Sequence, residues 1–210
     1  MHVAKLENDV SKAVMIAANV LRQKGVIIFP TDTLYGLGTD ALSNETVAKI
    51  YAIKGRNDGK PIHGIFSDLA MIERYAIVND IGRKLAEKFF PGPLTLIFKK
   101  KEGIDTGIAR GIESIGVRIP KNDFCIELAL WFDTPITATS ANISDQEPQR
   151  SIEKIIEQLG ERAKLVDLAI DAGELPPSLP STVVNVISGT PVVLREGAIS
   201  MTEIANVVHG

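Results

Sequence analysis

Helix-type and strand-type patterns alternate along this chain, and that alternation restricts the possible fold more than any other feature. Apolar residues recur at helical spacing in 10–21, and the short apolar run 26–29 follows almost directly. The first pattern is typical of an amphipathic helix and the second of a buried strand. The alternation continues to about residue 170. We therefore expect an α/β protein in which helices pack against a sheet.

Further elements are expected where capping residues or turn residues bound an apolar stretch. The expected helices begin after Ser43, near Ser67, at 79–90, at 122–131, at 151–159 and at the capping-box pattern Ser200-x-x-Glu203. The expected strands are 61–66, 94–98, 115–119, 134–139, 165–170, 182–187 and 191–194. The last two strands are separated by a short turn, which indicates an antiparallel pair and hence a mixed sheet. The lysines at 99–101 are expected in a solvated hairpin loop.

Composition favours one globular domain. The 210 residues are 45% hydrophobic and 23% charged, and no linker-like stretch divides them, so we expect 1–210 to form a single domain. With 23 basic and 26 acidic side chains, the net charge of −3 argues against a protein whose main task is to coat nucleic acid. The N-terminus lacks the apolar core of a signal peptide, and prolines interrupt the long uncharged run 175–194. We expect a cytoplasmic protein without a membrane partner.

Several motifs that carry familiar chemistry are missing from the sequence. It has no phosphate-binding P-loop, no dinucleotide-binding Gly-x-Gly-x-x-Gly turn and no Gly-x-Ser-x-Gly elbow of a serine hydrolase. The histidines are His2, His63 and His209, and none is paired with a cysteine, so no metal site is expected. The single cysteine, Cys125, lies on an apolar helical face and is expected to be a buried structural thiol.

Polar side chains gather where two of the expected strands end. The strand at 26–29 runs into Pro30-Thr-Asp-Thr-Leu-Tyr-Gly36, and the strand at 134–139 runs into Ser140-Ala-Asn142. In α/β sheets, ligands bind at the carboxyl ends of strands, where loops supply hydrogen-bond donors and acceptors. Each segment could also be no more than a turn or a helix cap built from Thr, Ser and Asp. Two such strand ends in one small domain favour a binding site.

Basic residues supply the third component of this predicted site. Lys54 and Arg56 follow an expected helix, and Lys60 begins the next strand, although such cations often only complement a helix dipole. Arg118 lies inside a strand pattern, where an arginine is costly to bury unless it binds a carboxylate or phosphate. Arg195 raises the same argument. Cations, hydroxyls and an amide without an evident nucleophile suit an anionic ligand such as a nucleotide.

Read together, these segments closely resemble motifs of the YrdC-like family. The matching segments are Pro30-Thr-Asp-Thr-Leu-Tyr-Gly-Leu37, Lys54-x-Arg56 with Lys60-Pro61, Gly116-Val-Arg-Ile-Pro120, Ser140-Ala-Asn142, Ser181-Thr-Val-Val184 and Leu194-Arg-Glu-Gly-Ala198. They follow the family's order over nearly the whole chain. The resemblance implies a single YrdC-like domain with a twisted mixed sheet flanked by helices, in the short form without an extra C-terminal domain.

The resemblance also implies an activity and a set of site residues. Members of the family combine L-threonine, bicarbonate or carbon dioxide, and ATP into threonylcarbamoyl-adenylate and pyrophosphate, and Mg²⁺ is expected with the nucleotide. The implied catalytic residues are Lys54 and Arg56; the implied ATP contacts are these two with Lys60, Ser140, Asn142 and Arg195; the implied L-threonine contacts are Thr33, Arg118 and Ser181. Asp145 stands where many relatives carry glycine. Ile65 stands where some carry histidine, so His63 is given no role.

The family's product feeds the formation of threonylcarbamoyladenosine next to the anticodon of tRNAs, through a downstream transferase. The resemblance therefore implies that tRNA is contacted weakly or indirectly. The main alternative is an RNA-binding module of the same fold without synthase activity, against which the net charge of −3 argues. A carbamoyl-transfer relative of the hydrogenase-maturation type would need a longer, cysteine-rich chain. An inactive paralogue is disfavoured by the intact Lys-x-Arg and Ser-x-Asn pairs.

Overall fold

The computed structural model describes residues 1–6, 9–55 and 60–209 of the chain. Its eleven strands form one sheet in the order β1-β9-β2-β3-β8-β4-β7-β6-β10-β11, with β5 paired to β6. The strands are β1 (His2–Lys5), β2 (Ile27–Phe29), β3 (Gly36–Gly38), β4 (His63–Ile65), β5 (Ala76–Ile77), β6 (Leu94–Lys100), β7 (Ser114–Arg118), β8 (Ile136–Ser140), β9 (Leu168–Asp171), β10 (Thr182–Asn185) and β11 (Val192–Arg195).

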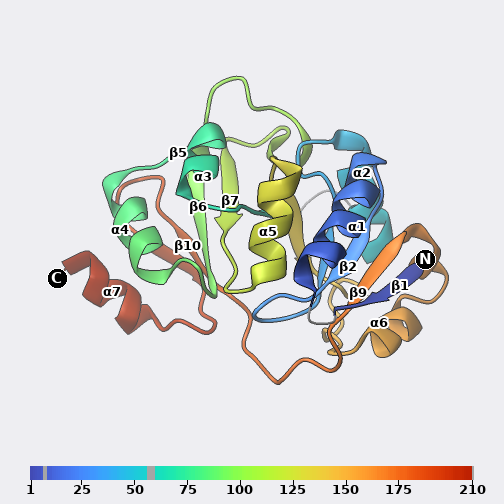
Figure 1. Ribbon diagram of the computed structural model, residues 1–210. Helices are drawn as coiled ribbons and strands as arrows, with labels where there is room; N and C mark the ends of the chain where they lie inside the picture. The colour runs from blue at the N-terminus through green and yellow to red at the C-terminus, as the bar shows by residue number, and fades with distance from the viewer. Residues whose placement is uncertain (7–8, 56–59, 210) are drawn as a thin grey trace.

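The described residues also form seven α-helices and two short 3₁₀ helices. The α-helices are α1 (Val10–Arg22), α2 (Asn44–Lys54), α3 (Leu69–Tyr75), α4 (Asp80–Phe89), α5 (Asp123–Phe132), α6 (Ile152–Leu159) and α7 (Met201–His209); the 3₁₀ helices are Gly107–Ala109 and Gly160–Leu165. The two chain ends lie at opposite ends of the sheet (Figure 1). No helix in this part of the chain has the length and apolar character needed to cross a bilayer.

The sheet is mixed, as the sequence predicts. Strands β1 and β9, β9 and β2, β4 and β7, and β6 and β10 pair in parallel, and the remaining neighbours are antiparallel. The β10–β11 pair is antiparallel, in agreement with the short turn between them. The α/β fold class is therefore confirmed.

Local capping explains where most helices begin. In six helices, the residue before the first turn accepts a hydrogen bond from a backbone N–H of that turn, which satisfies one of its free donors. These N-cap residues are Asp9, Ser43, Asp68, Asn79, Asn122 and Ser151. The cap expected near Ser67 is one residue later, because Asp68 accepts from the Met71 N–H at 2.7 Å. Ser200 and Glu203 form the predicted capping box of α7.

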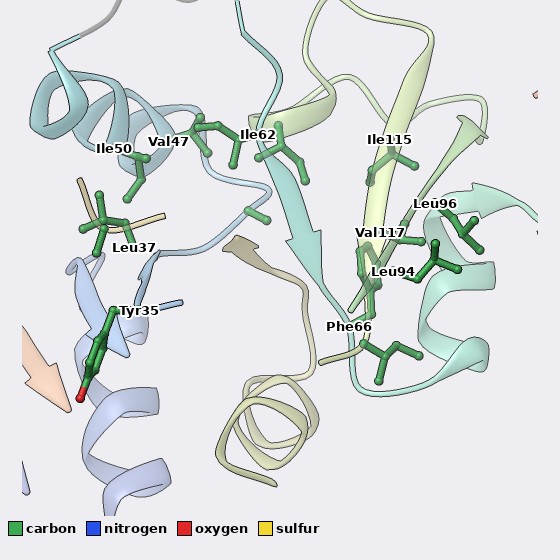
Figure 2. Packing of buried hydrophobic residues seen from close by; sticks show 14 of the residues in the cluster. Tyr35, Leu37, Val47, Ile50, Ile62, Phe66, Leu94, Leu96, Ile115 and Val117 are labelled. Atoms are coloured by element: carbon green, nitrogen blue, oxygen red, sulfur yellow. The ribbon is translucent and has the colours of Figure 1, made fainter. Parts of the chain in front are cut away.

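Alternate residues of the strands feed two hydrophobic clusters on opposite faces of the sheet. On β2, Ile27 and Phe29 belong to the cluster beneath α1 and α5, whereas Ile28 belongs to the cluster beneath the other helices. This is the alternation expected of a strand buried on both faces. Helices α1 and α5 pack side by side on their face (Figure 1). Figure 2 shows the other cluster, in which Ile50 of α2 lies over Leu37 of β3.

Strand β3 was not expected from the sequence, and its glycines explain why it can form. It lies between β2 and β8 and is antiparallel to both. A Cβ atom on Gly38 would lie 2.6 Å from Phe29 Cε1, and one on Gly36 would lie 3.0 Å from Phe29 Cζ. The phenylalanine ring therefore packs directly on the β3 backbone, which only glycine permits.

The lysine run at 99–101 does not form the solvated hairpin loop that the sequence predicts. Lys99 and Lys100 extend β6 and pair with β5. The Lys100 side chain is only 12% exposed, and its Nζ donates to Asp105 at 2.9 Å and to the Ala109 carbonyl at 3.1 Å. The expected strand at 165–170 also begins later, at Leu168, because Gly160–Leu165 forms a 3₁₀ helix.

Candidate functional site

A cavity of about 770 Å³ lies where the polar strand ends meet. Strands β2 and β8 are both antiparallel to β3, so they run in the same direction and end at the same edge of the sheet. Gly36 of β3 pairs with Phe29 on one side and with Ser140 on the other. The loops after β2 and β8 therefore lie next to each other, as expected for a ligand site in an α/β sheet.

Arg118, the last residue of β7, is held by the loop that follows β2. Its Nη2 donates to Asp32 Oδ1 at 2.7 Å and to Thr33 Oγ1 at 3.0 Å. The Arg118 and Asp32 side chains are 10% and 11% exposed, so this is a buried ion pair. Asp32 also accepts from the Lys121 N–H at 3.1 Å. Burial lowers the pKa of the Arg118 guanidinium from its usual value, and the Asp32 carboxylate opposes that shift.

One donor of Arg118 is left without a protein acceptor. Its Nε is buried, and no hydrogen-bond partner exists for it among the residues that the structure describes. Buried donors of native proteins are nearly always paired, so an unpaired one beside a cavity marks a place for a ligand acceptor. The group that fits a guanidinium N–H best is a carboxylate or a phosphate.

A second guanidinium, that of Arg195, lies at the same end of the cavity. It donates to the Ser181 carbonyl from Nε at 3.2 Å and from Nη2 at 2.8 Å, and Nη2 also lies 3.1 Å from Ser181 Oγ. Ser181 Oγ in turn lies 2.9 Å from Thr95 Oγ1. Burial, and then the charge of Arg118, lower the pKa of Arg195. Two cations that repel each other in one cavity favour an anionic ligand.

Lys54 fastens the loop after β8. Its side chain is buried at the end of α2, and Nζ donates to the Ser140 carbonyl at 2.7 Å, the Asn142 carbonyl at 2.9 Å and Asn142 Oδ1 at 3.0 Å. An ammonium group has three N–H donors, and these three oxygens can accept all of them. Lys54 therefore holds the Ser-Ala-Asn loop in place, in addition to lining the cavity.

The rest of this loop is closed by short contacts of its own. Ser140 Oγ donates to Asn142 Oδ1 at 2.5 Å, and Asn142 Nδ2 donates to the Gln146 carbonyl at 2.5 Å. The Ser144 N–H donates to the Lys54 carbonyl at 3.0 Å. Ser144 lines the cavity, and its Oγ is buried without a hydrogen-bond partner in the described part of the chain. It is a second polar atom that a ligand could satisfy.

Asp145 completes the turn in a left-handed conformation, with φ of 64°. Glycine adopts this region freely, and aspartate is among the few other residues that tolerate it. The turn is therefore formed although this chain lacks the glycine of many relatives. Asp145 Oδ1 pairs with Lys60 Nζ at 2.8 Å, and both residues line the cavity. Arg56, the other basic residue predicted here, lies outside the described residues.

Residues 172–181, which we call the strap, border the cavity on the side of the β2 loop. The Tyr35 hydroxyl donates to the Gly173 carbonyl at 2.8 Å. Ser178 Oγ donates to the Thr33 carbonyl. Burial raises the pKa of the Tyr35 phenol, so the hydroxyl remains protonated and able to donate. The strap is thus fastened to the same loop that holds Arg118.

The structure brings together the predicted site residues that it describes. Those that line the cavity are Thr33, Lys54, Lys60, Arg118, Ser140, Asn142, Ser181 and Arg195. His63, which was given no role, lines it as well. Cys125 is buried and donates to the Pro30 carbonyl at 3.3 Å, which confirms the prediction of a structural thiol.

Sequence reasoning missed three residues that the geometry brings to the site: Asp32, Thr95 and Ser144. Asp32 orients Arg118, and Ser144 has a hydroxyl with no hydrogen-bond partner among the described residues. Both belong to segments that the motifs had already singled out, so their position next to assigned residues was an available signal. Thr95 stands in an ordinary strand pattern, and no sequence signal indicates that it contacts Ser181.

Comparison with known proteins places these motifs in a family. The family model Sua5/YciO/YrdC, described as "Telomere recombination", matches residues 19–197. A putative threonylcarbamoyl-AMP synthase of Methanocaldococcus jannaschii is 40% identical over 180 residues, which cover 86% of this chain and 83% of that protein. The threonylcarbamoyl-AMP synthase of Pyrococcus abyssi is 33% identical over 196 residues, covering 93% of this chain but only 57% of that protein.

Solved structures agree with this relationship. The structure of Pyrococcus abyssi Sua5 in complex with L-threonine superposes with a TM-score of 0.88 at 31% identity, covering 99% of this chain and 60% of that one. Escherichia coli YciO superposes with a TM-score of 0.84 at 27% identity, covering 97% and 98% of the two chains. From the motif order, the cavity and these matches, we conclude that the chain belongs to the Sua5/YciO/YrdC family.

Proposed function

We propose that this chain is an L-threonylcarbamoyl-adenylate synthase, which forms threonylcarbamoyl-AMP and pyrophosphate from L-threonine, bicarbonate or carbon dioxide, and ATP. Relatives from Methanocaldococcus, Pyrococcus and mouse carry this activity in their names. The observation that supports the proposal most is the pairing, in one cavity, of a two-guanidinium end with an anchored loop of small polar residues. Such a cavity suits an amino acid and a nucleotide held next to each other.

The guanidinium end is the proposed binding site for L-threonine. The unpaired Nε of Arg118 would donate to the substrate carboxylate, while Asp32 keeps the guanidinium oriented. The hydroxyls of Thr33 and Ser181 lie at this end and offer partners to the substrate's own hydroxyl. Recognition through such hydrogen bonds discriminates strongly against analogues that lack the hydroxyl.

The opposite end is the proposed nucleotide site. Lys60 and the backbone and side chains of 140–144 would bind ATP there, together with Arg56, and Arg195 would contact the phosphates from the guanidinium end. No three His, Cys, Asp or Glu side chains of the described residues form a group able to hold a metal alone. Mg²⁺ would therefore be held chiefly by the phosphate oxygens of ATP. Asp145 and Glu147 line the cavity and could add one or two carboxylate ligands, as is common for this ion.

The proposed reaction needs positioning and charge neutralisation rather than a protein nucleophile. The threonine amine adds carbon dioxide and loses a proton to give a carbamate. A carbamate oxygen then forms a bond to the α-phosphorus while the bond to the pyrophosphate oxygen breaks. Arg195, Lys60 and the metal that accompanies ATP would stabilise the charge that develops. The burial of Cys125, which raises its thiol pKa, is consistent with a route that uses no cysteine nucleophile.

The product would be passed to a downstream transferase that modifies tRNA in the cytoplasm, and tRNA itself would contact this chain weakly or indirectly. The alternative, an RNA-binding module without synthase activity, has less support, because the net charge is −3 and the cavity is of a size for small ligands.

The test is pyrophosphate release from ATP by the purified chain. We expect release only when L-threonine and bicarbonate are both present, and an AMP-linked product that contains both. Omitting either substrate is the internal control. ATP turnover that ignores threonine would contradict the proposal, as would salt-resistant, sequence-specific RNA binding without any turnover.

A further inference from the structure

The ion pair between Lys60 and Asp145 joins two segments at the nucleotide end of the cavity. The residues are 85 positions apart in the chain, and their charged atoms lie 2.8 Å from each other. Both line the cavity, and their side chains are 65% and 80% exposed. The pair is therefore in reach of any ligand that enters from solvent at this end.

Asp145 is held in this position by the loop that carries it. The Gln146 N–H donates to the Ile143 carbonyl at 3.2 Å, and the Asn142 side chain donates to the Gln146 carbonyl at 2.5 Å. With φ of 64° at Asp145, these contacts close a tight turn directly after the predicted nucleotide contacts. Asp145 is consequently part of the binding loop, and these contacts hold the backbone from which its carboxylate reaches Lys60.

We propose that Asp145 weakens the binding of ATP by competing with the phosphates for Lys60, and so sets the concentration of ATP at which the enzyme works. This inference rests on the proposed function, which assigns Lys60 to ATP. A phosphate that approaches Lys60 must displace or share the carboxylate, and it also meets the carboxylate's like charge. Because the pair is exposed, water and salt screen both effects, and a change of about two- to fivefold in affinity is expected.

The opposite role is the main competitor of this proposal. A carboxylate beside a polyphosphate can also help to hold Mg²⁺, in which case it strengthens nucleotide binding. The two roles predict opposite signs for the same substitution: competition predicts a lower KM for ATP when the carboxylate is removed, and metal assistance predicts a higher one.

The decisive variants are Asp145→Asn and Asp145→Gly. Asparagine and glycine both adopt a positive φ, so neither substitution should disturb the turn. Asp133→Asn is the matched control, because Asp133 also has a positive φ of 58° and an exposed side chain paired with an arginine, Arg74, at 2.6 Å. It makes the same change in net charge away from the cavity.

The measurements are the KM for ATP at saturating threonine and bicarbonate, and the dissociation constant of ATP by calorimetry. We expect both Asp145 variants to lower these values about two- to fivefold, and Asp133→Asn to leave them unchanged. In a Lys60→Met background, Asp145→Asn should have a smaller effect, because the contested cation is gone and only the like-charge repulsion remains.

Each other result overturns the inference. Values that rise in the Asp145 variants indicate assistance to the metal or the nucleotide. If the KM and the dissociation constant for ATP do not change, or change equally in Asp133→Asn, Asp145 does not compete with the phosphates for Lys60. An undiminished effect in the Lys60→Met background shows that Lys60 is not the group in contest. Failure of the proposed function is distinguishable, because wild-type protein would then release no threonine-dependent pyrophosphate in the first place.

Discussion

At the scale of single residues, cations that the sequence treats alike have different roles in the structure. Lys54 is 3% exposed and donates to three oxygens of the loop after β8, whereas the Lys60 side chain is 65% exposed and pairs with one carboxylate. Burial decides the difference, since a buried ammonium group must find acceptors within the protein. Lys54 is thus both a positioning residue of the loop and a lining residue of the cavity.

This contrast predicts different outcomes for Lys54→Ala and Lys60→Ala. Lys54→Ala leaves loop oxygens without their donor, so we expect a loss of about 1–3 kcal/mol in the free energy of unfolding and weaker ATP binding together. Lys60→Ala should weaken ATP binding with little change in stability, because it is a surface substitution. Thermal melting and ATP titration of both variants test this. A Lys54→Ala protein as stable as wild type would show that the loop does not depend on this ammonium.

The buried ion pair of Arg118 and Asp32 was predictable from the sequence only in part. An arginine inside a strand pattern already indicates a costly charge that needs an anion. The sequence could not show that a protein carboxylate supplies part of this need, because Asp32 is 86 positions away. The sequence also could not show that Arg118 Nε is the donor without a partner among the described residues. That depends on the rotamer of the Arg118 side chain, which is determined by the packing around it.

At the scale of elements, helices were more predictable than strands, for a physical reason. A helix is specified by its own caps and apolar spacing, so Ser43 and Asn79 alone indicate where two helices begin. A short strand is specified by its neighbours. Strand β3 reads Gly-Leu-Gly, which has no strand propensity, and it forms because β2 and β8 flank it and because Phe29 packs on its glycines. Strand β1 similarly depends on β9, far away in the sequence.

The strap is an element without regular structure, and its position depends on a few hydrogen bonds. Tyr35 contributes two of them, since its hydroxyl donates to the Gly173 carbonyl at 2.8 Å and accepts from the Ala172 N–H at 2.9 Å. Ser181, at the far end of the strap, contacts Arg195 inside the cavity. Loosening the start of the strap should therefore reach the proposed threonine site.

Tyr35→Phe tests this connection. We expect faster amide hydrogen exchange in 172–181, a loss of about 1–3 kcal/mol in the free energy of unfolding and a higher KM for threonine, since two backbone groups lose their partner. Tyr75→Phe, at another buried tyrosine of the same hydrophobic cluster, is the control and should leave exchange in the strap unchanged. Unchanged exchange in Tyr35→Phe would mean that Ser178 and the backbone hold the strap without the phenol.

At the scale of the whole molecule, the cavity gathers segments from most of the chain. Its lining residues extend from Phe29 to Arg195 in the sequence. They include members of both hydrophobic clusters, such as Phe29 of one and Tyr35 of the other. The motif order indicates which segments contribute, but their convergence depends on the strand order of the sheet, which a single sequence does not display. Because the lining spans the fold, a ligand that binds it stabilises the native state as a unit.

This linkage allows amino-acid recognition to be measured without catalysis. A ligand at one hundred times its dissociation constant stabilises a protein by about 2.7 kcal/mol, which in a domain of this size raises the melting temperature by roughly 5–10 °C. With ATP present and bicarbonate removed, L-threonine should produce such a shift. L-valine has nearly the same shape but no hydroxyl, so it would make no hydrogen bond with the hydroxyls of Thr33 and Ser181, and the shift at equal concentration should be much smaller. L-serine, which keeps the hydroxyl and loses one methyl group, should lie between the two. Thermal denaturation over a concentration series of the three amino acids gives the comparison, and Arg118→Ala should abolish the shift for all three if the carboxylate binds there. A shift with valine as large as with threonine would show that shape alone selects the ligand, and that the hydroxyls at the guanidinium end take no part in recognition.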